Sequence, residues 1–296
     1  MQDINLEHIR VDPYLTPVLQ EKGIMAAMLR LDLLHAVVSG NKWFKLRFYI
    51  DQALKENKNT LITFGGAWSN HIHATAAAGK LHGLKTVGII RGEAAPVLSA
   101  TLQQAAAMGM ELHFVSREKY RQKQMPDHID ISGAQFIPEG GYGATGAKGA
   151  ATILRLINPD DYTHICCAVG SGTMMAGLIN AYRAKGLVTG ISALKNNHAL
   201  KYAVSDLLEA PKTDPEIIHD YHFGGFAKHN KLLLDFMNEL YRHTRIPTDI
   251  VYTGKLCFAV NDLARKNYFP PGSKILLIHS GGLQGNRSLP NGSLIF

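Results

Sequence analysis

The sequence predicts an α/β protein with two open parallel sheets, and three observations point to this fold class. At 296 residues, the chain is long enough to form two α/β lobes. From residue 59 onward, short apolar runs alternate with longer segments of helical periodicity. The apolar runs contain few polar residues, which is typical of parallel strands that helices cover on both faces.

Each expected strand is a short apolar run, and each expected helix follows a turn. A charged stretch at 117–130 and a glycine-rich segment at 139–146 interrupt this alternation. We therefore expect a smaller α/β domain at 45–150 and a larger domain formed by 1–44 and 151–296. The expected strands lie at 61–64, 86–90, 111–115, 163–169, 190–194 and 274–278, and the expected helices at 70–82, 99–109, 173–186 and 255–267.

The composition narrows the possible classes of protein. The formal net charge is +7, but the lysines and arginines are scattered, which favours a basic surface around an anionic ligand over a nucleic-acid interface. Three cysteines are too few for a disulfide framework and indicate a reducing compartment. Residues 1–7 lack the layout of a signal peptide, and no apolar stretch has the length of a membrane span. We expect a cytoplasmic protein that binds no nucleic acid and no membrane.

Two glycine-rich turns follow predicted strands and precede predicted helices. Gly170–Thr173 follows the apolar run 164–169, and Gly65–Asn70 follows the run 60–64. A turn at the start of a helix directs free backbone N–H groups and the positive end of the helix dipole toward an anion. Such a turn can also simply connect two elements, and Ser69 could serve only as a helix cap.

Lys42 lies ahead of both turns, between Gly40-Asn41 and two aromatic residues. A lone K-x-x-K spacing usually marks surface lysines, and Lys42 and Lys45 could be such a pair. A partly desolvated lysine, however, has a lowered pKa and becomes a usable amine nucleophile. A nucleophilic lysine and an anion-binding turn together predict a phosphorylated aldehyde cofactor, pyridoxal phosphate.

The spacing of other residues disfavours other kinds of site. Met175 occupies the position at which the dinucleotide fingerprint requires its third glycine, and no lysine precedes Thr173 as a Walker A loop would require. A nucleotide-binding oxidoreductase is therefore a distant alternative. His71 and His73 are two residues apart in a predicted helix and point to different faces, so we expect no metal site.

Six segments in order along the chain resemble one family, the 1-aminocyclopropane-1-carboxylate deaminases and D-cysteine desulfhydrases. This family belongs to the pyridoxal-phosphate enzymes related to the tryptophan synthase β-subunit. The matching segments cover most of the chain and are highly specific when taken together. They are Ser39–Leu46 (family G-G-N-K-x-R-K-L), Gly65–His71 (G-G-x-x-S-N-H), Pro138–Gly141 (P-x-G-G), Val169–Thr173 (the phosphate cup), Val251–Lys255 (V-Y-T-G-K) and His279–Gly282 (H-T-G-G).

The resemblance implies the fold, the cofactor and the catalytic groups. It implies pyridoxal-phosphate fold type II, with the cofactor between two lobes and bound mainly by the larger one, and it implies a homodimer. Lys42 would hold the cofactor covalently and later move protons. Ser69 would bind the carboxylate of a small amino-acid substrate, or act as a nucleophile in the ring-opening branch, and Tyr252 would stand near the substrate.

The resemblance also implies which residues bind the cofactor. Asn70 would contact its phenolic oxygen and Ser280 its pyridine nitrogen, since a hydroxyl suits a neutral pyridine. Backbone N–H groups suit a phosphate. The implied phosphate-binding residues are Gly170, Ser171, Gly172 and Thr173.

Two departures from the family pattern bear on the substrate. Phe226 stands where the family usually has a tyrosine that is one of its proposed catalytic groups. Trp43 and Phe44 replace a small or polar residue and an arginine next to Lys42. These changes leave the fold and the cofactor in place but put the named substrates in doubt.

Two positions favour one branch of the family. Thr253 and Ser280 match the desulfhydrase branch, because the ring-opening deaminases carry glutamate and leucine there. The leading hypothesis is therefore α,β-elimination like that of D-cysteine desulfhydrase, which releases pyruvate, ammonia and a leaving group. The alternatives are a 1-aminocyclopropane-1-carboxylate deaminase and a catalytically weak protein that binds an amino acid or the cofactor.

Overall fold

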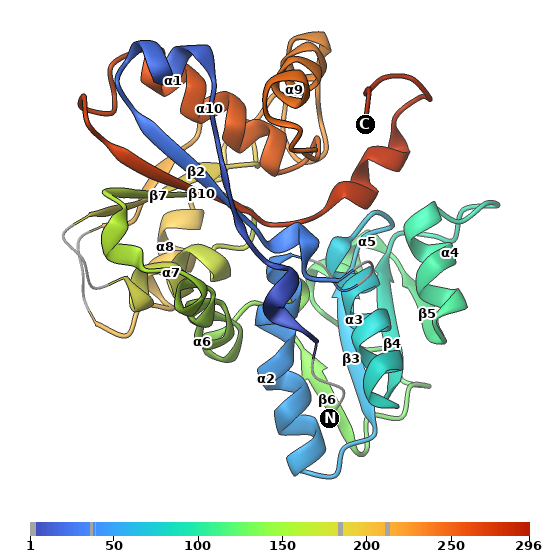
Figure 1. Cartoon of the computed structure of the whole chain (residues 1–296). Coiled ribbons are helices and arrows are strands. Elements are labelled where there is room, and N and C mark those ends of the chain that lie inside the picture. The colour runs from blue at the N-terminus through green and yellow to red at the C-terminus, as the bar shows by residue number, and fades with distance from the viewer. Residues whose placement is uncertain (1–3, 36–37, 39, 183–185, 211–213) are drawn as a thin grey trace.

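Two mainly parallel sheets dominate the fold, and they lie in different halves of the molecule (Figure 1). The computed structural model describes residues 4–35, 38, 40–182, 186–210 and 214–296. Ser39, the first residue of the predicted lysine motif, therefore lies outside the described residues. Within these ranges, no helix combines the length and the apolar character needed to cross a membrane.

The smaller sheet has four strands, each parallel to its neighbours. Its elements are β3 (Thr60–Gly65), α3 (Asn70–His82), β4 (Lys85–Arg91), α4 (Ala100–Ala107), β5 (Met110–Val115), α5 (Arg117–Arg121) and β6 (Ala134–Ile137). The strand order is β5-β4-β3-β6, so the chain returns to the far side of β3 for its last strand. The buried faces of β3 and β4 form apolar clusters with α3, α4 and α5.

The larger sheet has six strands in the order β1-β2-β10-β7-β8-β9. Its elements are β1 (Val11–Pro13), α1 (Pro17–Glu21), β2 (Met25–Arg30), β7 (His164–Val169), α7 (Thr173–Ala181), β8 (Leu187–Ser192), α8 (Leu200–Ser205), β9 (Glu216–Ile218), α9 (Lys231–Thr244), α10 (Thr253–Arg265) and β10 (Lys274–His279). Strands β2, β10, β7, β8 and β9 are parallel to their neighbours, and β1 pairs antiparallel with β2 at the edge.

Helices α2 (Asn41–Lys55) and α6 (Ala144–Ala151) join the halves. Helix α2, which is rich in aromatic residues, packs against α6, which consists mostly of small residues, and α6 packs in turn against α7. A methyl group on Gly149 would overlap with the Phe44 carbonyl oxygen, so the small residue lets the two helix backbones approach closely. One apolar cluster runs through α2, α3, α6, β7 and α7. The division into two domains stays a prediction, and α2 continues without a break across the expected boundary at residues 44–45.

Short 3-10 helices complete the described elements. Several of them connect the longer elements near the ends of strands. They are η1 (Leu6–His8), η2 (Leu31–Leu33), η3 (Glu139–Gly141), η4 (Thr152–Leu156), η5 (Pro159–Asp161) and η6 (Leu283–Ser288).

Each strand and helix expected from the periodicity has a counterpart in the structure, with ends that differ by up to a few residues. The expected helix at 173–186 ends at Ala181, and its residues 183–185 lie outside the described residues. Strand β8 begins at Leu187, earlier than expected, because the Leu187 N–H already donates to the Thr163 carbonyl at 3.0 Å. Among the described strands, β1, β2, β6 and β9 were not expected. Three of them, β1, β6 and β9, have only three or four residues, which are too few to show a period.

Three predicted motifs lie where parallel strands end. Gly65 closes β3, Val169 closes β7 and His279 closes β10, and a glycine-rich turn follows each of them. Ligands of parallel α/β sheets bind beyond the carboxyl ends of the strands. The topology therefore directs the predicted site residues to one region of the molecule.

Gly40 links the start of α2 to the turn after β10, and it generates a stability prediction. Its φ is +70°, a methyl group there would overlap with the Ser280 carbonyl, and the Asn41 N–H donates to that carbonyl at 3.2 Å. We predict that Gly40→Ala lowers the free energy of unfolding by more than the roughly 1–2 kcal/mol that a left-handed φ alone costs. Urea denaturation measures this loss.

Gly23→Ala is the matched control, because Gly23 has a φ of +63° and no atom within 4 Å of the added methyl group. Equal losses in the two variants would contradict the role assigned to the contact with Ser280.

Candidate active site

Lys42 lies in the first turn of α2, and its Nζ donates to Asn41 Oδ1 at 3.2 Å. The same nitrogen lies 5.9 Å from the centroid of the Tyr252 ring. Burial lowers the pKa of Lys42 to about 8, although the Asp249 carboxylate opposes this shift. The unprotonated amine that a nucleophile requires is therefore far more populated near neutral pH than in an ordinary lysine, although the protonated form still predominates.

Lys45 lies one helical turn further along α2, on the same face as Lys42. Its side chain is only 3% exposed, and its Nζ donates to the Gly140 carbonyl at 3.2 Å and to Ser171 Oγ at 3.4 Å. Burial, and next the charge of Lys42, hold the pKa of Lys45 well below its usual range. The sequence left Lys45 as a possible surface residue, and the structure shows that it is buried.

The predicted phosphate turn lies against Lys45. Ser171 Oγ is 3.0 Å from Thr173 Oγ1, and Gly172, with a φ of +82°, begins α7. Two hydroxyls, the free N–H groups of a nine-residue helix and a buried cation therefore meet at one place. The structure brings these groups together as the motif predicted.

This cluster fits a phosphate group. The hydrogen-bond partners of Lys45 Nζ are a carbonyl and a hydroxyl, and the ion pairs found among the described residues include neither Lys42 nor Lys45. A positive charge on a buried lysine with only neutral partners is strongly unfavourable, which is why its pKa is lowered. An anion between Lys45, Ser171 and the start of α7 would remove this penalty.

Tyr252 borders the cluster from the start of α10. A methyl group on Gly170 would lie 3.1 Å from the Tyr252 hydroxyl, so a glycine at this position lets the ring lie close against the phosphate turn. Burial, and then the nearby Asp249 carboxylate, raise the pKa of Tyr252 above its usual range. Its phenol therefore stays protonated at physiological pH and can donate a hydrogen bond.

Asp249 fixes the start of α10. Its side chain is fully buried, and its carboxylate accepts the N–H groups of Val251 at 3.0 Å, Tyr252 at 2.9 Å and Thr253 at 2.7 Å. These are the orphan donors of a helix N-terminus, which a carboxylate satisfies well. The sequence alone did not indicate Asp249, because it lies six residues before the expected helix at 255–267, whereas a capping residue normally precedes its helix directly.

Asn70 and Ser280 lie on neighbouring turns. The Asn70 side-chain oxygen accepts a hydrogen bond from Gln284 Nε2 at 2.9 Å, and Asn70 Nδ2 lies 2.8 Å from where a methyl group on Gly282 would be. Gly282 also lies next to Asp249, because the same methyl group would be 3.4 Å from the Asp249 Cγ. The turns after β3 and β10 therefore meet, as the predicted roles of Asn70 and Ser280 require.

Ser69 is the N-cap of α3, where its Oγ accepts the N–H groups of His71 and Ile72, both at 3.2 Å. The structure thus shows its capping role directly, and its role toward a substrate stays a prediction. His71, which follows the turn, bonds through Nε2 to Thr63 Oγ1 at 2.9 Å. Burial, followed by the charges of Lys42 and Lys45, holds the pKa of His71 well below its usual range, so the imidazole is neutral.

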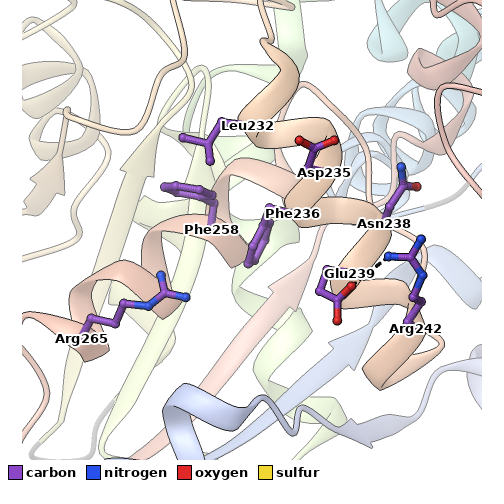
Figure 2. A pocket seen from close by; sticks show the side chains of 8 residues that line it. All are labelled: Leu232, Asp235, Phe236, Asn238, Glu239, Arg242, Phe258 and Arg265. Atoms are coloured by element: carbon purple, nitrogen blue, oxygen red, sulfur yellow. Dashed lines mark hydrogen bonds and ion pairs between the residues drawn. The ribbon is translucent and has the colours of Figure 1, made fainter.

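A cavity of about 550 Å³ lies elsewhere, between α9 and α10 (Figure 2). Phe236 and Phe258 form its apolar part, and an ion pair between Glu239 and Arg242 borders it. None of its lining residues belongs to the predicted site. Its residues are Leu232, Asp235, Phe236, Asn238, Glu239, Arg242, Phe258 and Arg265.

Comparison with known proteins identifies the relatives of this chain. The family model described as "Pyridoxal-phosphate dependent enzyme" matches residues 13–281. The chain is 29% identical to the bifunctional D-cysteine desulfhydrase/1-aminocyclopropane-1-carboxylate deaminase of Arabidopsis thaliana, over 84% of this chain and 70% of the relative. It is 27% identical to the 1-aminocyclopropane-1-carboxylate deaminase of Bradyrhizobium sp. (strain ORS 278), over 83% and 82%. A crystal structure of an ACC deaminase homologue has a TM-score of 0.82 and 26% identity, covering 96% of this chain and 92% of that one.

The difference between Lys42 and Lys45 generates a labelling prediction. We predict that borohydride reduction of the protein with pyridoxal phosphate labels Lys42, because the Lys42 pKa is about 8, whereas Lys45 Nζ donates hydrogen bonds to Gly140 and to Ser171 of the phosphate turn. Peptide mapping locates the label. The Lys45→Arg variant should still be labelled at Lys42, and the Lys42→Arg variant should not be labelled at this site. A label on Lys45 in the unmodified chain would refute the assignment.

Proposed function

The chain belongs to the pyridoxal-phosphate dependent enzymes, and from this premise and the geometry of the site we propose that it is a lyase or deaminase for a small amino acid. The observation that supports the proposal most directly is the pair Lys42 and Lys45. One is a lysine with a pKa of about 8, and the other is a buried cation at a turn that suits phosphate. A phosphorylated aldehyde has two matching groups: an aldehyde for the amine of Lys42 and a phosphate for the turn beside Lys45.

We propose that the phosphate turn and Lys45 hold the cofactor's phosphate, and that Asn70 and Ser280 contact its ring. When bound, pyridoxal phosphate supplies an electron sink that stabilises negative charge on the α-carbon of an amino acid. The residues proposed to hold the phosphate are Lys45, Gly170, Ser171, Gly172 and Thr173.

The protein's own groups would then position the substrate and move its protons. Lys42, with its lowered pKa, can take up a proton and return it near neutral pH. Tyr252 lies 5.9 Å from Lys42 Nζ, measured to the ring centroid, and carries a phenol that stays protonated. We propose that Lys42 is the base, that Tyr252 donates a hydrogen bond to the substrate and that Ser69 binds its carboxylate.

The surroundings of the pyridine nitrogen favour elimination over ring opening. Ser280 would offer that nitrogen a hydroxyl, and Thr253 stands where the ring-opening branch has glutamate. Asp249 lies close by, but its carboxylate is used by three backbone N–H groups. A nitrogen without a carboxylate partner stays neutral, which weakens the electron sink and favours substrates that expel a leaving group from the β-carbon.

A second candidate function is a catalytically weak protein that binds the cofactor or an amino acid. Phe226 favours it, because its ring lies 6.1 Å from the Tyr252 ring, so a residue without a hydroxyl borders the proposed acid–base pair. Turnover of small D- and L-amino acids separates the two candidates.

The assembly and location remain proposals from the sequence and the family resemblance. We propose a homodimer, which is the commonest symmetric assembly of soluble proteins, located in the cytoplasm. The substrate is proposed to be a free amino acid, without a nucleic-acid or membrane partner.

The first prediction compares two reactions. We predict that D-cysteine or β-chloro-alanine yields pyruvate faster than the cyclopropane amino acid yields 2-oxobutanoate, because the weak electron sink favours β-elimination. Both keto acids can be measured in one coupled assay. Lys42→Ala should lower both rates by about 10²–10⁴-fold, which excludes contaminating enzymes. Faster release of 2-oxobutanoate by the unmodified chain would reverse the proposed preference.

The second prediction concerns the missing hydroxyl. The phenylalanine at residue 226 lacks the hydroxyl of the family tyrosine. We predict that Phe226→Tyr increases the turnover number for one of these substrates, by up to the factor of about 10²–10⁴ that one acid–base group supplies. Phe226→Leu is the control, since it changes the ring without adding a hydroxyl. High activity of the unmodified chain with no gain in Phe226→Tyr would mean that Tyr252 already performs this step.

A further inference from the structure

We propose that Lys255 is a positioning residue, whose buried side chain holds the segment 221–226 in the shape that places Phe226 at the entrance of the active site. The segment would then set which β-substituents the site accepts. This inference rests on the proposed function for its substrate, and on the contacts of α10 for its geometry.

Lys255 connects α10 to the segment by two hydrogen bonds. Its side chain is 1% exposed, and its Nζ donates to the carbonyls of His222 and Gly225, both at 2.8 Å. The His222 carbonyl also accepts the Gly225 N–H at 3.0 Å, and the Gly225 carbonyl accepts the Lys228 N–H at 3.1 Å. The ammonium group therefore reinforces both turns of the segment.

The shape of the segment needs such support. Phe223 and Ala227 have φ angles of +51° and +55°, in the left-handed region that side chains disfavour. Gly224 and Gly225 also have positive φ angles, of +96° and +123°. A backbone of this kind persists only where surrounding contacts determine it.

One face of α10 supplies these contacts. Residues three apart along a helix lie on the same face, and Tyr252, Lys255 and Phe258 have this spacing. Phe258 packs edge-to-face against Phe223 at 4.9 Å between ring centroids, and Tyr252 packs against Phe226 at 6.1 Å. Lys255 lies between these two aromatic contacts.

Phe226 is placed between solvent and the proposed acid–base pair. It is 45% exposed, while Tyr252, against which it packs, lies next to Lys42 and the phosphate turn. A substrate that enters past Phe226 would meet an uncharged aromatic ring. We infer that this ring favours small or apolar β-substituents and that it moves when Lys255 no longer holds the segment.

Hydrogen exchange of the cofactor-free protein tests the positioning role without any catalytic assay. Lys255→Met removes both hydrogen bonds, so amides of residues 221–228 should exchange roughly tenfold faster or more, while amides of β7 and β10 stay protected. Lys274→Met, at the exposed start of β10, is the control and should match the unmodified chain. Unchanged protection in Lys255→Met overturns the proposal.

If Lys255→Met does not fold, Lys255→Gln provides the same test, since its amide can still donate to one carbonyl. It should give an intermediate increase in exchange within 221–228. Protection equal to that of the unmodified chain in Lys255→Gln overturns the proposal as well.

Kinetics of the cofactor-loaded enzyme test the link to Phe226. Phe226→Ala and Lys255→Met should each raise the KM for a small β-substituted amino acid about fivefold or more and leave kcat within about twofold. The double variant should show no further increase in KM, because Lys255 acts through Phe226. Additive effects, or a loss confined to kcat, would overturn this link. If no candidate substrate is turned over, the proposed function fails while the exchange result still decides the role of Lys255.

Discussion

Two lysines on one face of α2, Lys45 buried and Lys42 half-buried, impose the constraint on which the rest of the site depends. Lys42 and Lys45 lie in the first turns of a helix, whose N-terminal end already carries a partial positive charge. The charge of Lys42 also lowers the pKa of Lys45. The start of α7 and the hydroxyl of Ser171 lie where a bound anion would compensate the charge of these lysines.

Glycines let the surrounding segments approach closely enough to share this site. Gly40 allows α2 to begin directly against the turn after β10, and Gly170 allows the Tyr252 ring to lie against the phosphate turn. Gly282 leaves room for Asn70 beside Asp249. In each case a methyl group would meet atoms of a segment that is remote in the sequence, so the glycines of the motifs serve contacts between turns as much as the turns themselves.

The sequence was sufficient for the parts of this protein that are encoded locally. Apolar runs predicted β3, β4, β5, β7, β8 and β10, and the motif around Lys42 predicted a lysine of lowered pKa. Contacts between distant segments could not be predicted in this way. Lys45 meets Ser171 across 126 positions of the chain, and Lys255 meets His222 across 33. Periodicity reports which face of an element is apolar, but it does not report which loops meet beyond the ends of the strands.

Helix α10 contacts both the proposed cofactor site and the segment 221–226. Asp249 fixes the start of the helix, the N-cap residue Tyr252 lies near Lys42, and Lys255 in the first turn contacts the segment that ends in Phe226. If Phe226 lies at the entrance as proposed, a change at residue 226 would alter the entrance without disturbing the lysines proposed to bind the phosphate. The need to compensate the charge of these lysines restricts the phosphate turn, but it does not restrict the residue at the entrance. Within one family, then, substrate preference can change at the segment 221–226 while the cofactor site is retained.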